Sequence, residues 1–126
     1  MMTVARRAWL SVVGGVAIQL LVTSLPGRDV PIDVHHPWDW CIHATMYGGL
    51  GFLVVRAVTL SGWARLHLLW LGAGLSAYGA LDEVHQLFIP GRNGSAMDWV
   101  FDTIGVGAGL LFGSLLMRTK VAAWLR

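Results

Sequence analysis

Four long apolar runs are the feature that most constrains how this chain folds. They extend from Trp9 to Leu25, from about Trp40 to Leu60, from about Trp63 to Leu81 and from about Trp99 to Met117. A transmembrane helix needs about 20 apolar residues, with a range of roughly 17–25. Each run has a tryptophan near an end, where such side chains anchor helices at the membrane interface. We therefore predict an all-α membrane protein, a bundle of four transmembrane helices.

The composition supports this prediction. Of the 126 residues, 56% are hydrophobic and 13% are charged, which is too apolar for an ordinary soluble domain. The length predicts one domain over residues 1–126. The single cysteine, Cys41, excludes an internal disulfide and gives no cysteine-based metal motif. The basic residues form no stripe with interleaved aromatics, so we expect no nucleic-acid binding.

The charged residues predict how the helices are oriented. Seven basic residues lie at ends that share one side of a four-span bundle: Arg6, Arg7, Arg56, Arg65, Arg118, Lys120 and Arg126. The positive-inside rule makes that side cytoplasmic, with both termini inside. The first run lacks an Ala-x-Ala-like cleavage site, which favours a retained helix over a signal peptide. All seven acidic residues fall at or near the outer side, together with Arg28 and Arg92: Asp29, Asp33, Asp39, Asp82, Glu83, Asp98 and Asp102.

The segment from Asp82 to Gly105 concentrates polar residues between two apolar runs. It holds four of the seven carboxylates, together with His85 and Arg92. Carboxylates at the edge of the hydrocarbon layer are costly unless they are paired, solvated or used. The guanidinium of Arg92 can form paired hydrogen bonds with a carboxylate or with a phosphate. Neutralisation of the local acids and ligand binding are both open for this residue.

The second run carries Asp39, His43 and Tyr47, which recur every four residues and so share one helical face. At a rise of about 1.5 Å per residue, His43 lies roughly 6 Å deeper than Asp39. An ionisable residue within a span is a functional candidate. The alternatives are a surface or capping role for Asp39 and a hydrogen bond between helices for His43.

The third and fourth runs each carry small residues at helical spacing. Gly72, Ser76 and Gly79 form a packing seam that leads to Glu83 and turns it inward, about 100° away from Asp82. His85 and Gln86 extend the same helix. In the fourth run, Asp98 and Asp102 precede a glycine stripe that we expect to press against another helix: Gly105, Gly109 and Gly113. An N-cap role for Asp98, in competition with Ser95, is the alternative reading.

Two blocks of sequence resemble the VanZ-like family. The first block is Asp39-x-x-x-His43-x-x-x-Tyr47-Gly48. The second block reads, from Asp82 to Gly105, Asp-Glu-x-His-Gln-x-Phe-x-Pro-Gly-Arg-x-x-Ser-x-x-Asp-x-x-x-Asp-x-x-Gly. Relatives usually have Lys beside the first Asp and Phe after the His, where this chain has Trp40 and Ala44. The position of Asp102 is often Asn in relatives.

The resemblance implies a small multi-pass protein of the bacterial cytoplasmic membrane. Some members are associated with reduced susceptibility to teicoplanin-type glycopeptides, which implies a role with cell-envelope precursors or with antibiotic access to them. Carried over by position, the site candidates are Asp39, His43, Tyr47, Asp82, Glu83, His85, Gln86, Arg92, Ser95, Asp98, Asp102 and Gly105.

Three functions are open at this point. The first is binding of a lipid-linked or anionic envelope ligand through Tyr47, Gln86, Arg92 and Ser95, with its tail between helices. The second is an intramembrane hydrolase or transferase acting on a lipid-linked phosphate. Its catalytic candidates are Asp39, His43, Asp82, Glu83, His85, Asp98 and Asp102. The third is a polar cluster that only stabilises the bundle, although buried ionic clusters are poor stabilisers.

No cofactor is identified from the sequence. Carboxylates and histidines suit a divalent metal ion, which leaves metal-assisted chemistry open. No diagnostic metal-binding spacing such as His-Glu-x-x-His is present. The expected partners are membrane lipids and a lipid-linked envelope precursor.

Overall fold

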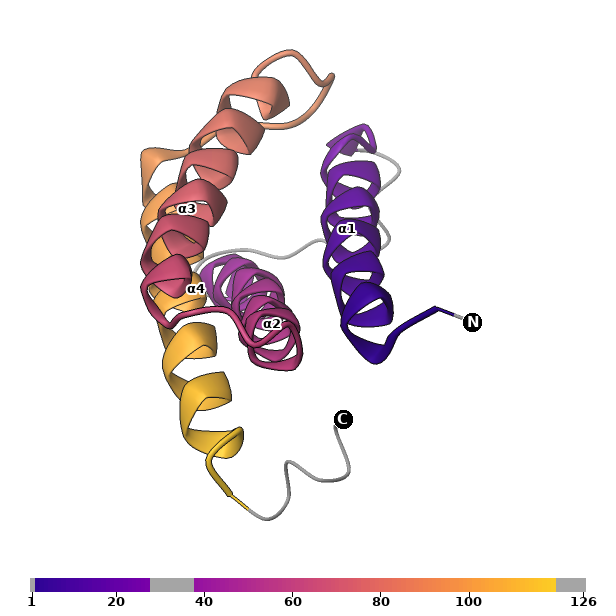
Figure 1. Ribbon diagram of the computed structural model, residues 1–126. Helices are drawn as coiled ribbons and strands as arrows, with labels where there is room; N and C mark the ends of the chain where they lie inside the picture. Colours follow the sequence, from indigo (N-terminus) through magenta and orange to yellow (C-terminus); the bar gives the residue numbers. More distant parts are fainter. Residues whose placement is uncertain (1, 28–37, 120–126) are drawn as a thin grey trace.

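A computed structural model describes residues 2–27 and 38–119 of the chain (Figure 1). Its elements are the helices α1 (Val4–Thr23), α2 (Trp38–Leu60), α3 (Leu66–Gln86) and α4 (Ala96–Leu116), which confirms the all-α prediction. Five charged residues used above to predict the orientation lie outside the described residues: Arg28, Asp29, Asp33, Lys120 and Arg126.

Within the described ranges, α1, α2 and α4 are long and apolar enough to cross a membrane. The helix α3 has 21 residues but is not among them. Its last turns carry Asp82, Glu83, His85 and Gln86, which lower its mean hydropathy. A fourth span at α3 therefore stays a prediction.

Caps define three of the helix ends: α1 and α4 start a few residues before the predicted spans, and α2 ends at Leu60 as predicted. Thr3 accepts a hydrogen bond from the Arg6 N–H at 3.2 Å, so α1 starts before Trp9. Ser95 caps α4 in the same way and starts it before Trp99. The helix α2 ends in a Schellman motif, in which Gly62 has a φ of 67° and the Trp63 N–H donates to the Val58 carbonyl at 3.1 Å.

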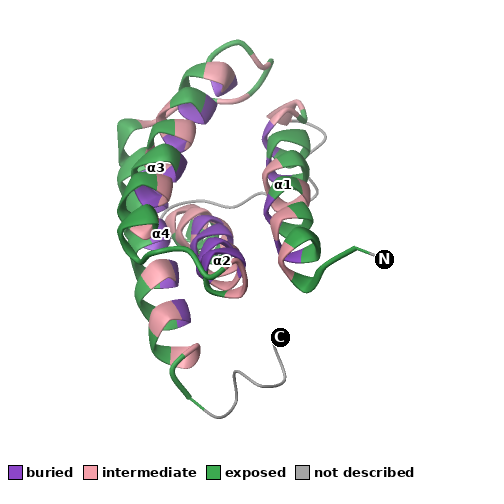
Figure 2. Ribbon diagram, in the orientation of Figure 1, coloured by how far each residue is buried: buried purple, intermediate pink, exposed green. Residues whose placement is uncertain are grey.

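In the bundle, α2 lies between α1 and the pair formed by α3 and α4 (Figure 1). Buried residues occupy the faces that the helices turn toward one another, while the outer faces are exposed (Figure 2). The core cluster includes Tyr47, Leu50 and Val54 of α2 and Val106 of α4. Large apolar side chains remain on the outside, which is the pattern of a protein surrounded by lipid.

The most extensive helix contact, between α2 and α4, depends on glycine. A Cβ atom on Gly105 would collide with the Ala44 carbonyl, and one on Gly109 would collide with the Gly48 carbonyl. On the facing helix, a Cβ on Gly51 would lie 2.7 Å from the Val106 carbonyl oxygen. The two backbones therefore approach each other as small residues permit in transmembrane helix pairs.

Contacts at the two ends of the bundle show which helix termini lie together. At one end, Trp9 Nε1 donates to Ser61 Oγ at 2.9 Å, so the start of α1 lies beside the end of α2. At the other, Thr23 at the end of α1 meets Asp82 near the end of α3. This second end, which we call the acidic end, also holds Glu83, Asp98 and Asp102. The side of the membrane that it faces is a prediction from the charge distribution.

Candidate functional site

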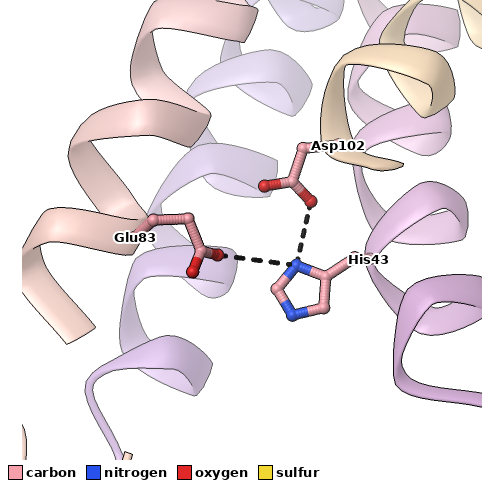
Figure 3. A group of neighbouring side chains, drawn as sticks. All are labelled: His43, Glu83 and Asp102. Carbon is pink, nitrogen blue, oxygen red and sulfur yellow. Dashed lines mark hydrogen bonds and ion pairs between the residues drawn. The ribbon is translucent and has the colours of Figure 1, made fainter. Parts of the chain in front are cut away.

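Three side chains from three helices meet at the acidic end: His43 of α2, Glu83 of α3 and Asp102 of α4 (Figure 3). His43 Nδ1 lies 2.9 Å from Asp102 Oδ1, which is a hydrogen-bond distance. The same nitrogen lies 3.8 Å from Glu83 Oε1. Asp102 and Glu83 are buried and His43 is half-buried. We call these three residues the polar triad.

Glycines on α4 and α3 determine where the side chains of the polar triad lie. Because Gly105 lets α4 reach the backbone of Ala44, Asp102, one turn before Gly105, is brought face to face with His43, which directly precedes Ala44. On α3, a Cβ at Gly79 would lie 3.2 Å from Asp102 Oδ2 and 3.4 Å from Tyr47 Cε1. The absence of a side chain at Gly79 therefore makes room for both the carboxylate and the phenol ring.

The loop between α3 and α4 holds the Glu83 carboxylate. The Ser95 N–H donates to Glu83 Oε2 at 2.7 Å, and Gln86 Nε2 donates to Oε1 at 3.3 Å. A Cβ at Gly94 would collide with the Glu83 carbonyl, so the loop lies directly on the end of α3. Glu83 is thus oriented from the loop side as well as from its own helix.

Ser95 is the N-cap of α4, and this result corrects the alternative that Asp98 fills that position. The Ser95 side chain accepts from the N–H groups of Met97 and Asp98, at 3.2 and 3.3 Å. Asp98 is instead a buried residue of the first helical turn, 7% exposed. Ser95 is the capping residue because its short hydroxyl reaches the unpaired N–H groups at the start of the helix.

The remaining candidates do not all join the triad. Asp82 is directed to α1, where Thr23 Oγ1 donates to its Oδ1 at 2.8 Å. Asp39 lies in the first turn of α2 and accepts from the Trp40 N–H at 2.8 Å. His85 is half-buried near the end of α3. Tyr47 is buried, 1% exposed, one turn below His43.

Arg92 lies half-buried in the loop that closes the acidic end. Its N–H donates to the Ile89 carbonyl at 3.1 Å, closing a turn through Pro90 and Gly91. Gly91 has a φ of 76°, as the third position of a type II turn requires. Among the described residues, the Arg92 Nε is buried without a hydrogen-bond partner.

The packing candidates of α3 face α4. A Cβ at Gly72 would lie 2.8 Å from a Leu110 methyl group, and Ser76 Oγ lies 2.7 Å from Thr103 Oγ1. The lower glycine of the α4 stripe, Gly113, packs against α2, where a Cβ would lie 3.1 Å from Val55 Cβ.

Sequence reasoning missed the contribution of α1 to the acidic end. Gln19 and Thr23 are buried, 3% and 4% exposed, and Thr23 bonds Asp82 across the bundle. The available signal was their spacing of four residues within an otherwise apolar run, which places both on one helical face. The stacking of Trp40 on Phe101, with ring centroids 4.9 Å apart, was also missed.

An apolar cavity opens next to the triad. It has a volume of about 240 Å³ and lies between the end of α3 and the start of α4. Its lining includes the polar residues Glu83 and Ser95 beside mostly apolar residues, namely Ala80, Val84, Leu87, Gly94, Ala96 and Trp99. An amphiphilic molecule could therefore meet apolar surface and a polar group in one place.

The sequence of the chain decides its family. The family model of VanZ/LLP1 matches residues 12–117. The chain belongs to the VanZ/LLP1 family. Searches of curated proteins and of solved structures returned no match. Family membership and the three apolar helices together identify this VanZ/LLP1 protein as a membrane protein.

The matched range of this VanZ/LLP1 protein contains the whole polar triad and the loop that closes it. The arrangement has two chemical uses. If His43 donates its Nδ1 proton to Asp102, its Nε2 can accept a proton, as in oriented histidine bases. If the imidazole is instead deprotonated at Nδ1, the same three side chains offer ligand atoms to a metal ion.

Proposed function

We propose that this VanZ/LLP1 protein binds a lipid-linked, anionic cell-envelope ligand at the acidic end of its bundle. This end faces outward from the bacterial cytoplasmic membrane. The observation that carries the proposal is the cavity between α3 and α4, whose mostly apolar lining includes Gly94 and Ser95 of the loop that also carries Arg92. A lipid tail fits the apolar lining, and the head group reaches the polar residues at its edge.

Arg92 is the residue that best recognises an anion in this arrangement. It lies three residues before Ser95, in the loop that also forms part of the cavity wall. A guanidinium binds phosphate oxygens through paired hydrogen bonds. Its buried Nε has no hydrogen-bond partner among the described residues, so the side chain can turn toward a phosphate without breaking a bond at that atom.

A larger apolar groove, of about 410 Å³, lies between α1 and α2. Its lining includes Ile18, Gln19, Met46 and Phe52 but no charged residue. A phosphate there would lose its water without gaining an ionic partner, which is costly. The α3–α4 cavity is therefore the better site for an anionic lipid.

The proposal extends to glycopeptide susceptibility. A protein that binds a lipid-linked envelope precursor at the outer membrane face changes how much of that precursor is open to antibiotics from outside. The resemblance described above, in which some members affect susceptibility to teicoplanin-type glycopeptides, supports this extension.

Lipid titration tests the proposal. Tryptophan fluorescence of the purified protein in nanodiscs is followed while polyprenyl phosphate, or the uncharged polyprenol of equal length, is added. We expect saturable binding of the phosphate only. Arg92→Ala should weaken it at least about tenfold, because hydrogen bonds to charged groups contribute about 1.5–3 kcal/mol.

The matched control is Arg65→Ala, which removes an exposed arginine just before α3, at its far end from Glu83. This variant should bind polyprenyl phosphate like the wild type. Equal affinity for the two lipids, or equal loss in both arginine variants, would contradict the proposal.

The hydrogen bond between His43 and Asp102 favours a second candidate, an intramembrane hydrolase or transferase acting on a lipid-linked phosphate. A histidine held by a carboxylate is a common general base, and Glu83 lies beside it. Release of inorganic phosphate from polyprenyl diphosphate by the wild type, lost in Glu83→Gln and Asp98→Asn, would favour this function over simple binding. Absence of turnover in the wild type would reject it for this substrate.

A further inference from the structure

The polar triad brings one nitrogen and two oxygen ligand atoms together. These atoms all lie within 4.8 Å of one another (Figure 3). Neighbouring ligand atoms around a tetrahedral ion with bonds of about 2.0–2.2 Å are separated by about 3.3–3.6 Å. The distances from His43 Nδ1, 2.9 Å to Asp102 and 3.8 Å to Glu83, lie on either side of that range. Small side-chain movements would therefore let all three atoms bind one ion.

A second observation concerns atoms beside the triad that are buried without a partner. Asp102 is fully buried, and its Oδ2 has no hydrogen-bond partner among the described residues. The same holds for the hydroxyl of Tyr47, which is 1% exposed. Both side chains border Gly79, so they share one small region of the interior. Buried polar atoms of this kind need a partner, because their desolvation is otherwise uncompensated.

The charge of the triad points in the same direction. In the described part of the chain, the basic side chain beside Glu83 and Asp102 is that of His43, and no lysine or arginine forms an ion pair with either carboxylate. With a neutral imidazole, the two carboxylates carry two negative charges at the edge of an apolar bundle. A divalent cation supplies the matching positive charge, and buried charges in proteins are usually paired or bound to metal.

We propose that His43, Glu83 and Asp102 bind a first-row divalent cation, with Zn²⁺ preferred. Mg²⁺ and Ca²⁺ favour ligand sets made of oxygen alone, whereas an imidazole beside carboxylates suits zinc. Three protein ligands leave a coordination position open, as in catalytic zinc sites. In the complex of the proposed function, a phosphate oxygen of the lipid head group takes that position. This last step rests on the proposed function, but metal binding itself does not.

Metal titration without lipid tests the site. Purified protein in detergent is treated with chelator, dialysed, and titrated with ZnCl₂ by calorimetry, and the bound metal is counted by mass spectrometry. We expect one zinc ion per wild-type chain and no heat with MgCl₂. His43→Ala, Glu83→Gln and Asp102→Asn should each lower zinc affinity at least about tenfold. Loss of a residue that only supports a metal ligand already lowers affinity by about 10–100-fold, so loss of a ligand should lower it at least as much.

Two matched controls address the trivial explanations. His67→Ala removes an exposed histidine near the other end of the bundle. Asp82→Asn removes one negative charge beside the triad but takes away none of the three ligand atoms. His67→Ala should keep wild-type zinc affinity, and Asp82→Asn should lower it much less than the loss of a ligand does. The near-isosteric Glu83→Gln and Asp102→Asn keep the test valid if His43→Ala fails to fold.

Two results would overturn the site: no zinc bound to the wild type at roughly 100 µM ZnCl₂, at which a site of micromolar Kd would be about 99% occupied, or equal zinc binding by wild type and Asp102→Asn. A separate experiment tests the bridging role, by repeating the polyprenyl phosphate titration in the presence of EDTA. A loss of lipid affinity supports the bridging role of the metal. Unchanged lipid affinity contradicts the bridge alone, so failure of the metal and failure of lipid binding are distinguishable.

Discussion

Single polar residues connect the helices at the acidic end. Thr23 bonds Asp82, His43 bonds Asp102, and the Ser95 N–H bonds Glu83, so each of α1, α2 and the α3–α4 loop contributes one contact. Each of these contacts joins residues far apart in the sequence. Because buried donors and acceptors lose water on folding, each pair favours one arrangement of the bundle over others.

The bond between Thr23 and Asp82 gives a prediction at this scale. Thr23→Val keeps the shape of the side chain and leaves Asp82 Oδ1 without its donor at 2.8 Å. We expect the free energy of unfolding to fall by about 1.5–3 kcal/mol, the usual contribution of a hydrogen bond to a charged group. Titration with SDS in mixed micelles measures it.

The control is the same substitution at Thr45, whose exposed hydroxyl bonds only the Cys41 carbonyl of its own helix at 2.7 Å. Thr45→Val should leave the free energy of unfolding nearly unchanged. If Thr23→Val and Thr45→Val lower the free energy of unfolding equally, the hydrogen bond between Thr23 and Asp82 does not stabilise the bundle.

At the scale of elements, the close approach of α2 and α4 determines the geometry of the site. The stripe Gly105, Gly109 and Gly113 on α4 faces α2, and Gly48 and Gly51 on α2 face α4. Larger side chains at these glycines would push α2 and α4 apart and separate His43 from Asp102. The site therefore depends on residues that carry no functional group.

Gly109→Ala tests this dependence. The added Cβ would collide with the Gly48 carbonyl, so we expect a loss of about 1–3 kcal/mol, as for other overpacked sites. Gly107→Ala is the control, since Gly107 is exposed and no atom lies within 4 Å of its added Cβ. Alanine should be neutral or stabilising there, by up to about 1 kcal/mol. A Gly107 variant as unstable as the Gly109 variant would contradict this account of the contact.

At the scale of the whole molecule, charge separates the two ends of the bundle. Arg6, Arg7 and Arg118 lie at the end where α1 begins and α4 finishes, and the acidic residues that the structure describes lie at the other end, together with Arg92. The positive-inside rule predicts the orientation in the membrane from this distribution. The proposed function requires this orientation, because an envelope ligand is met at the outer face.

Cysteine labelling tests the orientation. In a Cys41→Ser background, a membrane-impermeant maleimide should label Asn93→Cys in intact cells. It should label Arg118→Cys only after the cells are permeabilised. Both positions are exposed, so burial does not limit either reaction. Labelling with the reverse pattern would place the acidic end in the cytoplasm.

The length of the apolar runs was enough to predict the four helices, and helical spacing was enough to predict the inward direction of some polar residues. A spacing of three residues places Asp102 one turn above Gly105 of the glycine stripe, and adjacent positions on a helix separate Asp82 from Glu83. In the structure, Asp102 and Glu83 are buried beside His43, while Asp82 turns to α1.

The pairing of helices could not be predicted in the same way. A glycine stripe indicates that a close neighbour exists, but it does not say which helix that neighbour is. The hydrogen bond from Thr23 to Asp82 depends on how α1 packs against α3. The hydrogen bond from the Ser95 N–H to Glu83 depends on the conformation of the loop between α3 and α4. Local spacing in a single sequence carries no information about such contacts.

Photo-crosslinking tests the central claim, that the acidic end binds a lipid-linked anion with its tail in the α3–α4 cavity. The protein in nanodiscs is irradiated with a polyprenyl phosphate that carries a diazirine on its first isoprene units, and adducts are mapped by peptide mass spectrometry. We predict adducts on the cavity residues Val84, Leu87 and Trp99, reduced by excess unlabelled polyprenyl phosphate and by Arg92→Ala. Adducts confined to Ile18 and Phe52 in the groove between α1 and α2, or insensitive to competitor, would contradict the account.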